Sequence, residues 1–192
     1  QEAIAAAAEQ ERAGIVKAAD MLRAAGFTVD IISVGSSPTL MRSASETGVT
    51  EIRAGVCAFF DLFMTNVGIC TVDNIAGSVL TTVIGRKVNK NRVITDSGFL
   101  AMSRDRGTQR QKKDYGYGLV CDVDGHPLNE GKILLAGTNQ EHGIIDLPEN
   151  TTLTQTDFPN HACPTAAPYA HFLVVENGFI VDVIGHVRGW EI

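Results

Sequence analysis

The stretch TVDIISVGSSPT, residues 28–39, determines how the N-terminal part of this chain is expected to fold. Its first half, residues 28–34, is a β-branched run with the composition of a buried parallel strand. The run leads directly into Gly35-Ser36-Ser37-Pro38-Thr39, and small residues with a proline near the first helical position are typical of a strand–turn–helix junction. Backbone N–H groups at such a helix start, beside serine hydroxyls, can hold an anion, although a plain turn with Ser37 as N-cap would use the same residues.

The segments on either side continue an alternation of helices and strands. Residues 2–25 are rich in alanine and carry apolar residues at helical spacing, which predicts an amphipathic helix that ends at Gly26. Residues 51–61 predict a second strand, in which Gly55 permits the close approach of a backbone or a ligand. The order helix, strand, helix, strand over residues 1–66 is the arrangement of barrels and doubly wound sheets, but it is too short to close either one.

From about residue 72 the pattern changes to strands. Turn signals separate several of them, and Asn177-Gly178 between two apolar runs predicts a tight hairpin. Residues 103–116 are polar and charged, which predicts a surface loop. Strands are expected at 78–88, 92–95, 117–122, 132–137, 151–157, 171–176 and 179–187. The C-terminal two-thirds of the chain is therefore predicted to be a mostly β unit.

Length and charge narrow the possible classes of function. The 192 residues are enough for one substantial core, and the net charge of −6 argues against a nucleic-acid or anionic-membrane partner. The sequence contains no run of about 18 apolar residues, so it predicts no transmembrane helix. The four cysteines form no paired motif, so we expect reduced thiols in a cytoplasmic protein; they are Cys57, Cys70, Cys121 and Cys163.

A second stretch, Pro159-Asn160-His161-Ala162-Cys163-Pro164-Thr165, has the residue types of a metal site. In an extended segment, residues two apart point to the same face, so His161 and Cys163 would direct an imidazole nitrogen and a sulfur at one point. Zinc and other late first-row metals accept both ligands, and two protein ligands leave coordination positions open for water or substrate. The alternative is a buried cysteine and a hydrogen-bonded histidine at a strand end.

Several stretches of the chain occur together, in the same order, in one known family. They are Ser33–Thr39, Glu51–Gly55, Asp96–Gly98, Gln140–Gly143, Pro159–Thr165 and, near the end, Val187–Trp190. With them the chain resembles the C-terminal half of the D-serine dehydratase, D-threo-3-hydroxyaspartate dehydratase and D-threonine aldolase family, which consists of alanine-racemase-type, fold type III pyridoxal-phosphate enzymes. The resemblance implies an α/β fold, with part of an alanine-racemase-type (β/α) barrel over residues 1–70. A mostly antiparallel β domain carrying the metal site would follow over residues 71–192.

The resemblance also implies a role for each matching position. The phosphate of pyridoxal 5'-phosphate would be held at the ends of barrel strands by Gly35, Ser36, Ser37, Thr39, Gly55 and Val56. His161 and Cys163 would bind a divalent metal such as zinc or manganese beside the cofactor, and a cysteine at this position resembles the dehydratase branch rather than the aldolase branch. The implied reaction removes the β-hydroxyl from a D-3-hydroxy amino acid, such as D-threo-3-hydroxyaspartate or D-serine, and yields a keto acid and ammonia.

The sequence departs from the family pattern at two points. Cys57 stands where the family has an aromatic residue. The family's Schiff-base lysine lies near the N-terminus of a much longer chain, and no lysine here matches it, so the catalytic residue is unknown. We therefore expect a fragment, or one piece of a split enzyme, that does not catalyse the reaction alone.

The expected partners are a small-molecule D-hydroxy amino acid and either a second copy in a homodimer or a missing N-terminal half. Two alternatives remain open at this point. One is a D-threonine-type aldolase of the same family, and the other is a non-catalytic metal-binding fragment.

Overall fold

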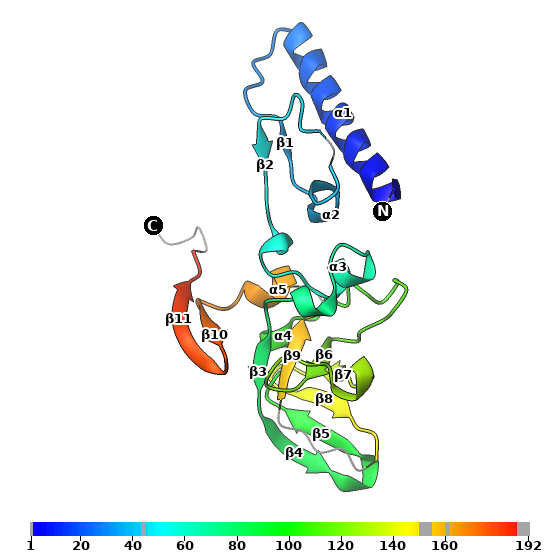
Figure 1. The fold of residues 1–192 in the computed structure, drawn as a ribbon, viewed down its shortest axis with the longest axis vertical. Coiled ribbons are helices and arrows are strands. Elements are labelled where there is room, and N and C mark those ends of the chain that lie inside the picture. Colours follow the sequence, from blue (N-terminus) through cyan, green and yellow to red (C-terminus); the bar gives the residue numbers. More distant parts are fainter. Residues whose placement is uncertain (1, 44, 150–154, 160–161, 188–192) are drawn as a thin grey trace.

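The structure is a computed structural model that describes residues 2–43, 45–149, 155–159 and 162–187 (Figure 1). A long helix and two short parallel strands form one end of the molecule, at the top of Figure 1, and antiparallel sheets form the other end. A two-stranded hairpin lies to one side of these sheets.

The N-terminal elements follow the predicted order. Helix α1 (Glu2–Ala24) confirms the predicted helix, and Gly26 follows it at φ +89°, a conformation that glycine adopts without strain. Strands β1 (Ser33–Val34) and β2 (Glu51–Ile52) pair in parallel. Helix α2 (Ser37–Leu40) begins directly after β1, which confirms the strand–turn–helix junction.

The two N-terminal strands are much shorter than predicted. The sequence predicts strands over residues 28–34 and 51–61, whereas only β1 and β2 form a ladder. A β-branched run becomes a strand only where a neighbour accepts its backbone hydrogen bonds, and these two strands have only each other within the described residues. After β2 the chain forms instead a 3₁₀ turn, η1 (Val56–Ala58), and a short helix, α3 (Leu62–Asn66).

Antiparallel strands make up most of the remaining described chain. One sheet has the order β4-β5-β8-β7, a second has the order β3-β9-β6, and a hairpin joins β10 to β11. The strands are β3 (Val79–Thr81), β4 (Val83–Lys87), β5 (Arg92–Thr95), β6 (Gly118–Cys121), β7 (Leu135–Thr138), β8 (Gly143–Asp146), β9 (Gln155–Pro159), β10 (His171–Glu176) and β11 (Phe179–Gly185). Short helices connect them: η2 (Val72–Asn74), η3 (Val88–Lys90), α4 (Phe99–Met102), η4 (Leu128–Gly131) and α5 (Ala162–Ala166).

Most of the predicted strands are confirmed. The predicted strand at 78–88 is divided into β3 and β4, which lie in different sheets, and β8 lies outside the predicted strands. The strand expected at 151–157 is observed at 155–159, and residues 151–154 lie outside the described part of the chain. The predicted hairpin turn is confirmed, because Asn177 and Gly178 both have positive φ, at +51° and +78°.

Three clusters of buried apolar side chains form the core. The first lies around the four-stranded sheet and consists of Val93, Met102, Val120, Ile133, Leu135, Ile145 and Leu147. The second joins α3 to β6 and consists of Leu62, Ile75, Tyr115, Leu119 and Cys121. The third, called here the Val56 cluster, consists of Val56, Met64 and Ala162 with partly buried aromatic neighbours. None of the helices in the described part combines the length and apolar content that crossing a membrane requires.

Candidate functional site

Two turns lie at the carboxyl ends of the parallel strands β1 and β2. Because parallel strands run in the same direction, both ends reach the same edge of the pair. The Arg53 N–H donates to the Val34 carbonyl over 2.9 Å, and a Cβ added to Gly35 would lie 3.0 Å from the Arg53 Cβ. The structure therefore brings together the two strand-end turns, residues 35–39 and 53–56, which carry the predicted phosphate-binding residues.

Several groups in the strand-end turns fit an anion. Ser36 is the N-cap residue of α2, and its hydroxyl makes no capping hydrogen bond. The Leu40 N–H donates to the Ser36 carbonyl over 2.8 Å, so the Ser37 N–H belongs to the first turn, whose donors have no partner inside the helix. A Cβ added to Gly55 would meet no atom within 4 Å, so the backbone there faces open space.

The Thr39 side chain fits an anion less well. Its hydroxyl donates to the Glu11 carboxylate of α1 over 2.5 Å, which links α2 to α1. A phosphate brought to this hydroxyl would meet the negative charge of Glu11. The donors that suit an anion in this turn are therefore the backbone and Ser36.

The predicted extended conformation around the metal ligands is wrong at Cys163. Strand β9 ends at Pro159 and α5 begins at Ala162, so Cys163 is helical. Pro164 falls in the first turn of α5, where a missing N–H costs nothing, so the proline that suggested an extended segment is compatible with a helix. His161 lies outside the described residues, and its pairing with Cys163 stays a prediction.

Cys163 has the environment of a protonated thiol. The residue is exposed, but partial burial of the thiol and, second, the nearby Asp61 carboxylate raise the pKa of Cys163. Metal binding requires the thiolate, so it releases this proton.

The second strand-end turn meets Ala162 in the Val56 cluster; Ala162 is the middle residue of positions 161–163, called here the ligand segment. Val56 follows the end of β2, and Ala162 lies between the two predicted metal ligands. Both are buried, and they pack in one cluster with Met64 of α3. Figure 1 shows α5 beside the chain that leaves β2. The fold thus brings two stretches together that are about 100 residues apart in sequence.

Asp61 is a polar residue at this junction that sequence analysis missed. Its side chain is 0% exposed, and its carboxylate accepts backbone hydrogen bonds from Met64 and Ala162. An aspartate before the apolar run that starts at Leu62 could have predicted the N-cap of α3. No sequence signal could have predicted the second bond, because Ala162 is 101 residues away.

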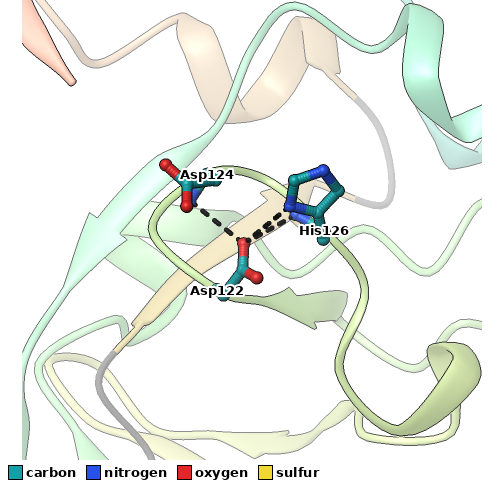
Figure 2. A group of neighbouring side chains, drawn as sticks. All are labelled: Asp122, Asp124 and His126. Atoms are coloured by element: carbon teal, nitrogen blue, oxygen red, sulfur yellow. Dashed lines mark hydrogen bonds and ion pairs between the residues drawn. The ribbon is translucent and has the colours of Figure 1, made fainter. Parts of the chain in front are cut away.

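A separate group of possible metal ligands, Asp122, Asp124 and His126, lies in an exposed turn (Figure 2). An Asp122 carboxylate oxygen accepts the backbone N–H groups of Asp124 and His126 over 3.0 and 2.9 Å. The hydrogen bond from the His126 N–H is the main reason why the pKa of Asp122 lies below its usual range. This arrangement closes the turn after β6 and needs no ion.

The motif stretches 96–98 and 140–143 also pack against each other. A Cβ added to Gly98 would lie 2.4 Å from the Gln140 carbonyl oxygen, and the Phe99 N–H donates to the Asn139 carbonyl over 2.9 Å. Their glycines therefore serve this close backbone approach.

The comparisons with known proteins agree with this fold. The serine dehydratase domain family matches residues 76–175. The chain is 45% identical over 200 residues to D-threo-3-hydroxyaspartate dehydratase from Delftia sp. strain HT23, with 98% of this chain and 52% of that protein covered. It is 29% identical over 175 residues to D-serine dehydratase from Dictyostelium discoideum, with 81% of this chain and 42% of that protein covered. The chain thus spans about half the length of these curated relatives.

Solved structures are similar to most of the chain. A histidine-to-alanine variant of D-threo-3-hydroxyaspartate dehydratase matches with a TM-score of 0.85 at 44% identity, covering 98% of this chain and 51% of that one. A cysteine-to-alanine variant of the same dehydratase in the metal-free form matches with a TM-score of 0.84 at 44% identity, covering 98% of this chain and 52% of that one. An alanine-racemase-like protein from Idiomarina loihiensis matches with a TM-score of 0.81 at 41% identity, covering 90% and 48%. With this mixed α/β fold and the family match over residues 76–175, the chain belongs to the serine dehydratase domain family.

Proposed function

We propose that the protein carrying this chain is a metal-assisted, pyridoxal-phosphate-dependent dehydratase that converts a D-3-hydroxy amino acid to a keto acid and ammonia. The observation that carries the proposal is the Val56 cluster, in which a strand-end turn packs against Ala162 of the ligand segment. This contact supports a common location for the cofactor and the metal. D-threo-3-hydroxyaspartate is the first candidate substrate and D-serine the second, because relatives at 45% and 29% identity bear those names.

We assign the cofactor phosphate to the strand-end turns. The residues that would hold it are Gly35, Ser36, Ser37, Thr39, Gly55 and Val56. The open space at Gly55 and the Ser36 hydroxyl, which makes no capping hydrogen bond to α2, support this assignment. Thr39 would contribute its backbone, because its hydroxyl donates to Glu11. In this proposal residues 1–70 contribute part of the barrel and residues 71–192 form the β domain with the metal site.

We assign the divalent metal to His161 and Cys163. An imidazole and a thiolate are a donor pair that zinc accepts. The histidine and the cysteine changed in the two solved variants of D-threo-3-hydroxyaspartate dehydratase are two positions apart, and the cysteine variant is in the metal-free form, which supports the assignment. When bound, the cofactor supplies an electron sink at the α-carbon and the metal a Lewis acid for the departing hydroxyl.

The residues of this chain would keep the two sites at a fixed separation. Val56 and Ala162 are both buried in the Val56 cluster, so neither residue can shift without opening this part of the core. A fixed separation matters because small displacements of the reacting groups reduce rates strongly.

The test is a product assay on the whole protein that carries this chain, supplied with pyridoxal phosphate. We expect ammonia and a keto acid from D-threo-3-hydroxyaspartate or D-serine, loss of turnover on chelation, and recovery with manganese or zinc. Cys163→Ala should abolish metal-dependent turnover and keep the cofactor absorbance. Cys121→Ala, a cysteine change in β6 away from the ligand segment, should keep turnover.

Other outcomes would identify another function. Turnover that survives both chelation and Cys163→Ala would remove the metal from the mechanism. Glycine and an aldehyde as products would identify an aldolase, and metal binding without cofactor absorbance or turnover would favour a non-catalytic metal-binding protein. Light scattering on the same preparation tests the expected homodimer.

A further inference from the structure

One buried carboxylate is bonded to both sides of the junction between the proposed cofactor and metal sites. Asp61 is 0% exposed, and each of its two oxygens accepts one backbone N–H. Oδ1 accepts from Met64 in the first turn of α3 over 2.9 Å, and Oδ2 accepts from Ala162 at the start of α5 over 2.9 Å. A buried charge is costly unless it is hydrogen-bonded, so both bonds are needed to keep this side chain inside.

The second bond falls at the centre of the ligand segment. Ala162 lies between His161 and Cys163, is 5% exposed, and packs in the Val56 cluster. A charged acceptor makes a stronger hydrogen bond than a neutral one, so it holds the orientation of this peptide group more firmly. Fixing that peptide group restricts the directions in which the neighbouring side chains can point.

We propose that Asp61 is a positioning residue for the metal site, which holds Cys163 at the start of α5 in its metal-binding geometry through the Ala162 N–H. The inference rests on the proposed metal role of His161 and Cys163. The cap of α3 alone does not require an aspartate, because serine and asparagine also cap helices. A carboxylate places two acceptor oxygens against two separate N–H groups, whereas an asparagine side chain would turn its own donors toward one of them.

Two variants separate the role in α3 from the role in the ligand segment. Asp61→Ser and Asp61→Asn each keep one oxygen that can cap α3, and both lack the second carboxylate oxygen. Ile145→Val is the control for a general loss of stability, because Ile145 is 0% exposed in the four-stranded sheet and belongs to a different cluster. All proteins are measured below their own melting temperatures, which circular dichroism determines first.

The probe is Co²⁺, titrated into the whole protein without substrate. The thiolate-to-cobalt charge-transfer band reports the bond from Cys163 and its geometry. We expect the Kd for Co²⁺ to rise about 10- to 100-fold in both Asp61 variants, together with a change in the energy or intensity of this band. Ile145→Val should keep the wild-type Kd and spectrum.

The remaining outcomes distinguish failure of this inference from failure of the proposed function. A wild-type Kd and band in either folded Asp61 variant would overturn the positioning role and leave the proposed function standing. A weaker Kd with an unchanged band would assign Asp61 only the effect of its charge, which also overturns positioning. If His161→Ala and Cys163→Ala bind Co²⁺ as the wild type does, the proposed metal site fails and the inference fails with it.

Discussion

Gly98 has no room for a side chain, because a backbone segment lies directly against its Cα. A Cβ there would lie 2.4 Å from the Gln140 carbonyl oxygen and 2.5 Å from the backbone nitrogen of His142. We expect Gly98→Ala to lower the free energy of unfolding by about 1–3 kcal/mol, measured by denaturant titration. Gly14→Ala is the matched control, because a Cβ in that part of α1 meets no atom within 4 Å, and it should not lower the same quantity. Similar effects of the two changes would contradict the close approach at Gly98.

Asp96, directly after β5, connects this strand to the last residue of β3 and to Thr82, which follows it. Its carboxylate accepts the Thr81 hydroxyl over 2.7 Å and the Thr82 N–H over 2.8 Å. Partial burial acts to raise the pKa of Asp96, but these hydrogen bonds outweigh it, so the pKa lies below its usual value of 3.8. The bonded carboxylate therefore stabilises the fold above the unfolded-state pKa, and this contribution disappears as the pH falls through the lower folded-state pKa.

A pH series of melting temperatures tests the role of Asp96. Asp96→Asn should melt below the wild type at neutral pH, and the difference should close as the pH falls through the lowered folded-state pKa of Asp96, because the wild-type carboxylate then becomes neutral as well. Thr81→Val removes one of the two donors to Asp96, so its melting temperature should differ from that of the wild type with the same dependence on pH but by a smaller amount. A difference that does not change with pH would mean that the charge of Asp96 contributes nothing.

At the scale of the elements, local patterns predicted the type of each segment better than its length. Helix α1 and the hairpin turn at Asn177-Gly178 were predictable because helical spacing and positive-φ residues act within a few positions. The lengths of β1 and β2 depend on which strands lie beside them, and β8 exists because β5 and β7 flank it. Such neighbours come from distant parts of the chain and leave no local signal.

The hairpin β10–β11 contacts the rest of the described chain through an aromatic pair. Phe172 of β10 lies with its ring centroid 5.3 Å from that of Phe59, which packs on the Val56 cluster. We expect Phe172→Ala to increase amide exchange in both hairpin strands about tenfold, because an aromatic pair contributes about 0.5–1.5 kcal/mol beyond its buried area. Leu173→Ala, at a side chain that is 58% exposed, is the control and should leave exchange unchanged. Equal exchange in the two variants would mean that the hairpin is held by other contacts.

For the whole molecule, the sequence could predict each half of the candidate site but not their contact. Motif order indicated the strand-end turns and the ligand segment, and the pairing of β1 with β2 places Gly35 and Arg53, the first residues of the two turns, against each other. The packing of Val56 against the ligand segment and the double hydrogen bond of Asp61 depend on how distant elements dock. Docking follows from total packing, so spacing along the chain does not specify it.

Within the described chain, buried apolar side chains are few in the N-terminal part and many in the four-stranded sheet. Among the described residues before the Val56 cluster, 2–43 and 45–55, the buried apolar side chains are only Ala8, Ala19 and Ile32. Met21, Phe27 and Ile31 are each at least 64% exposed. A single helix and a two-stranded ladder are marginal without a packed face. The four-stranded sheet, in contrast, buries side chains such as Leu135 and Ile145 completely.

We therefore expect amides in α1, β1 and β2 of the 192-residue chain to exchange through local opening. Amides in β5, β6 and β8 should exchange only at rates that approach those of global unfolding. Native-state hydrogen exchange read by mass spectrometry compares both groups in one sample, so the sheet is the internal control. Gly14→Ala should slow exchange in α1 and leave the sheet unchanged, because it adds helix propensity only there. Equal protection of the two groups would show instead that the N-terminal elements and the sheets unfold as one cooperative unit.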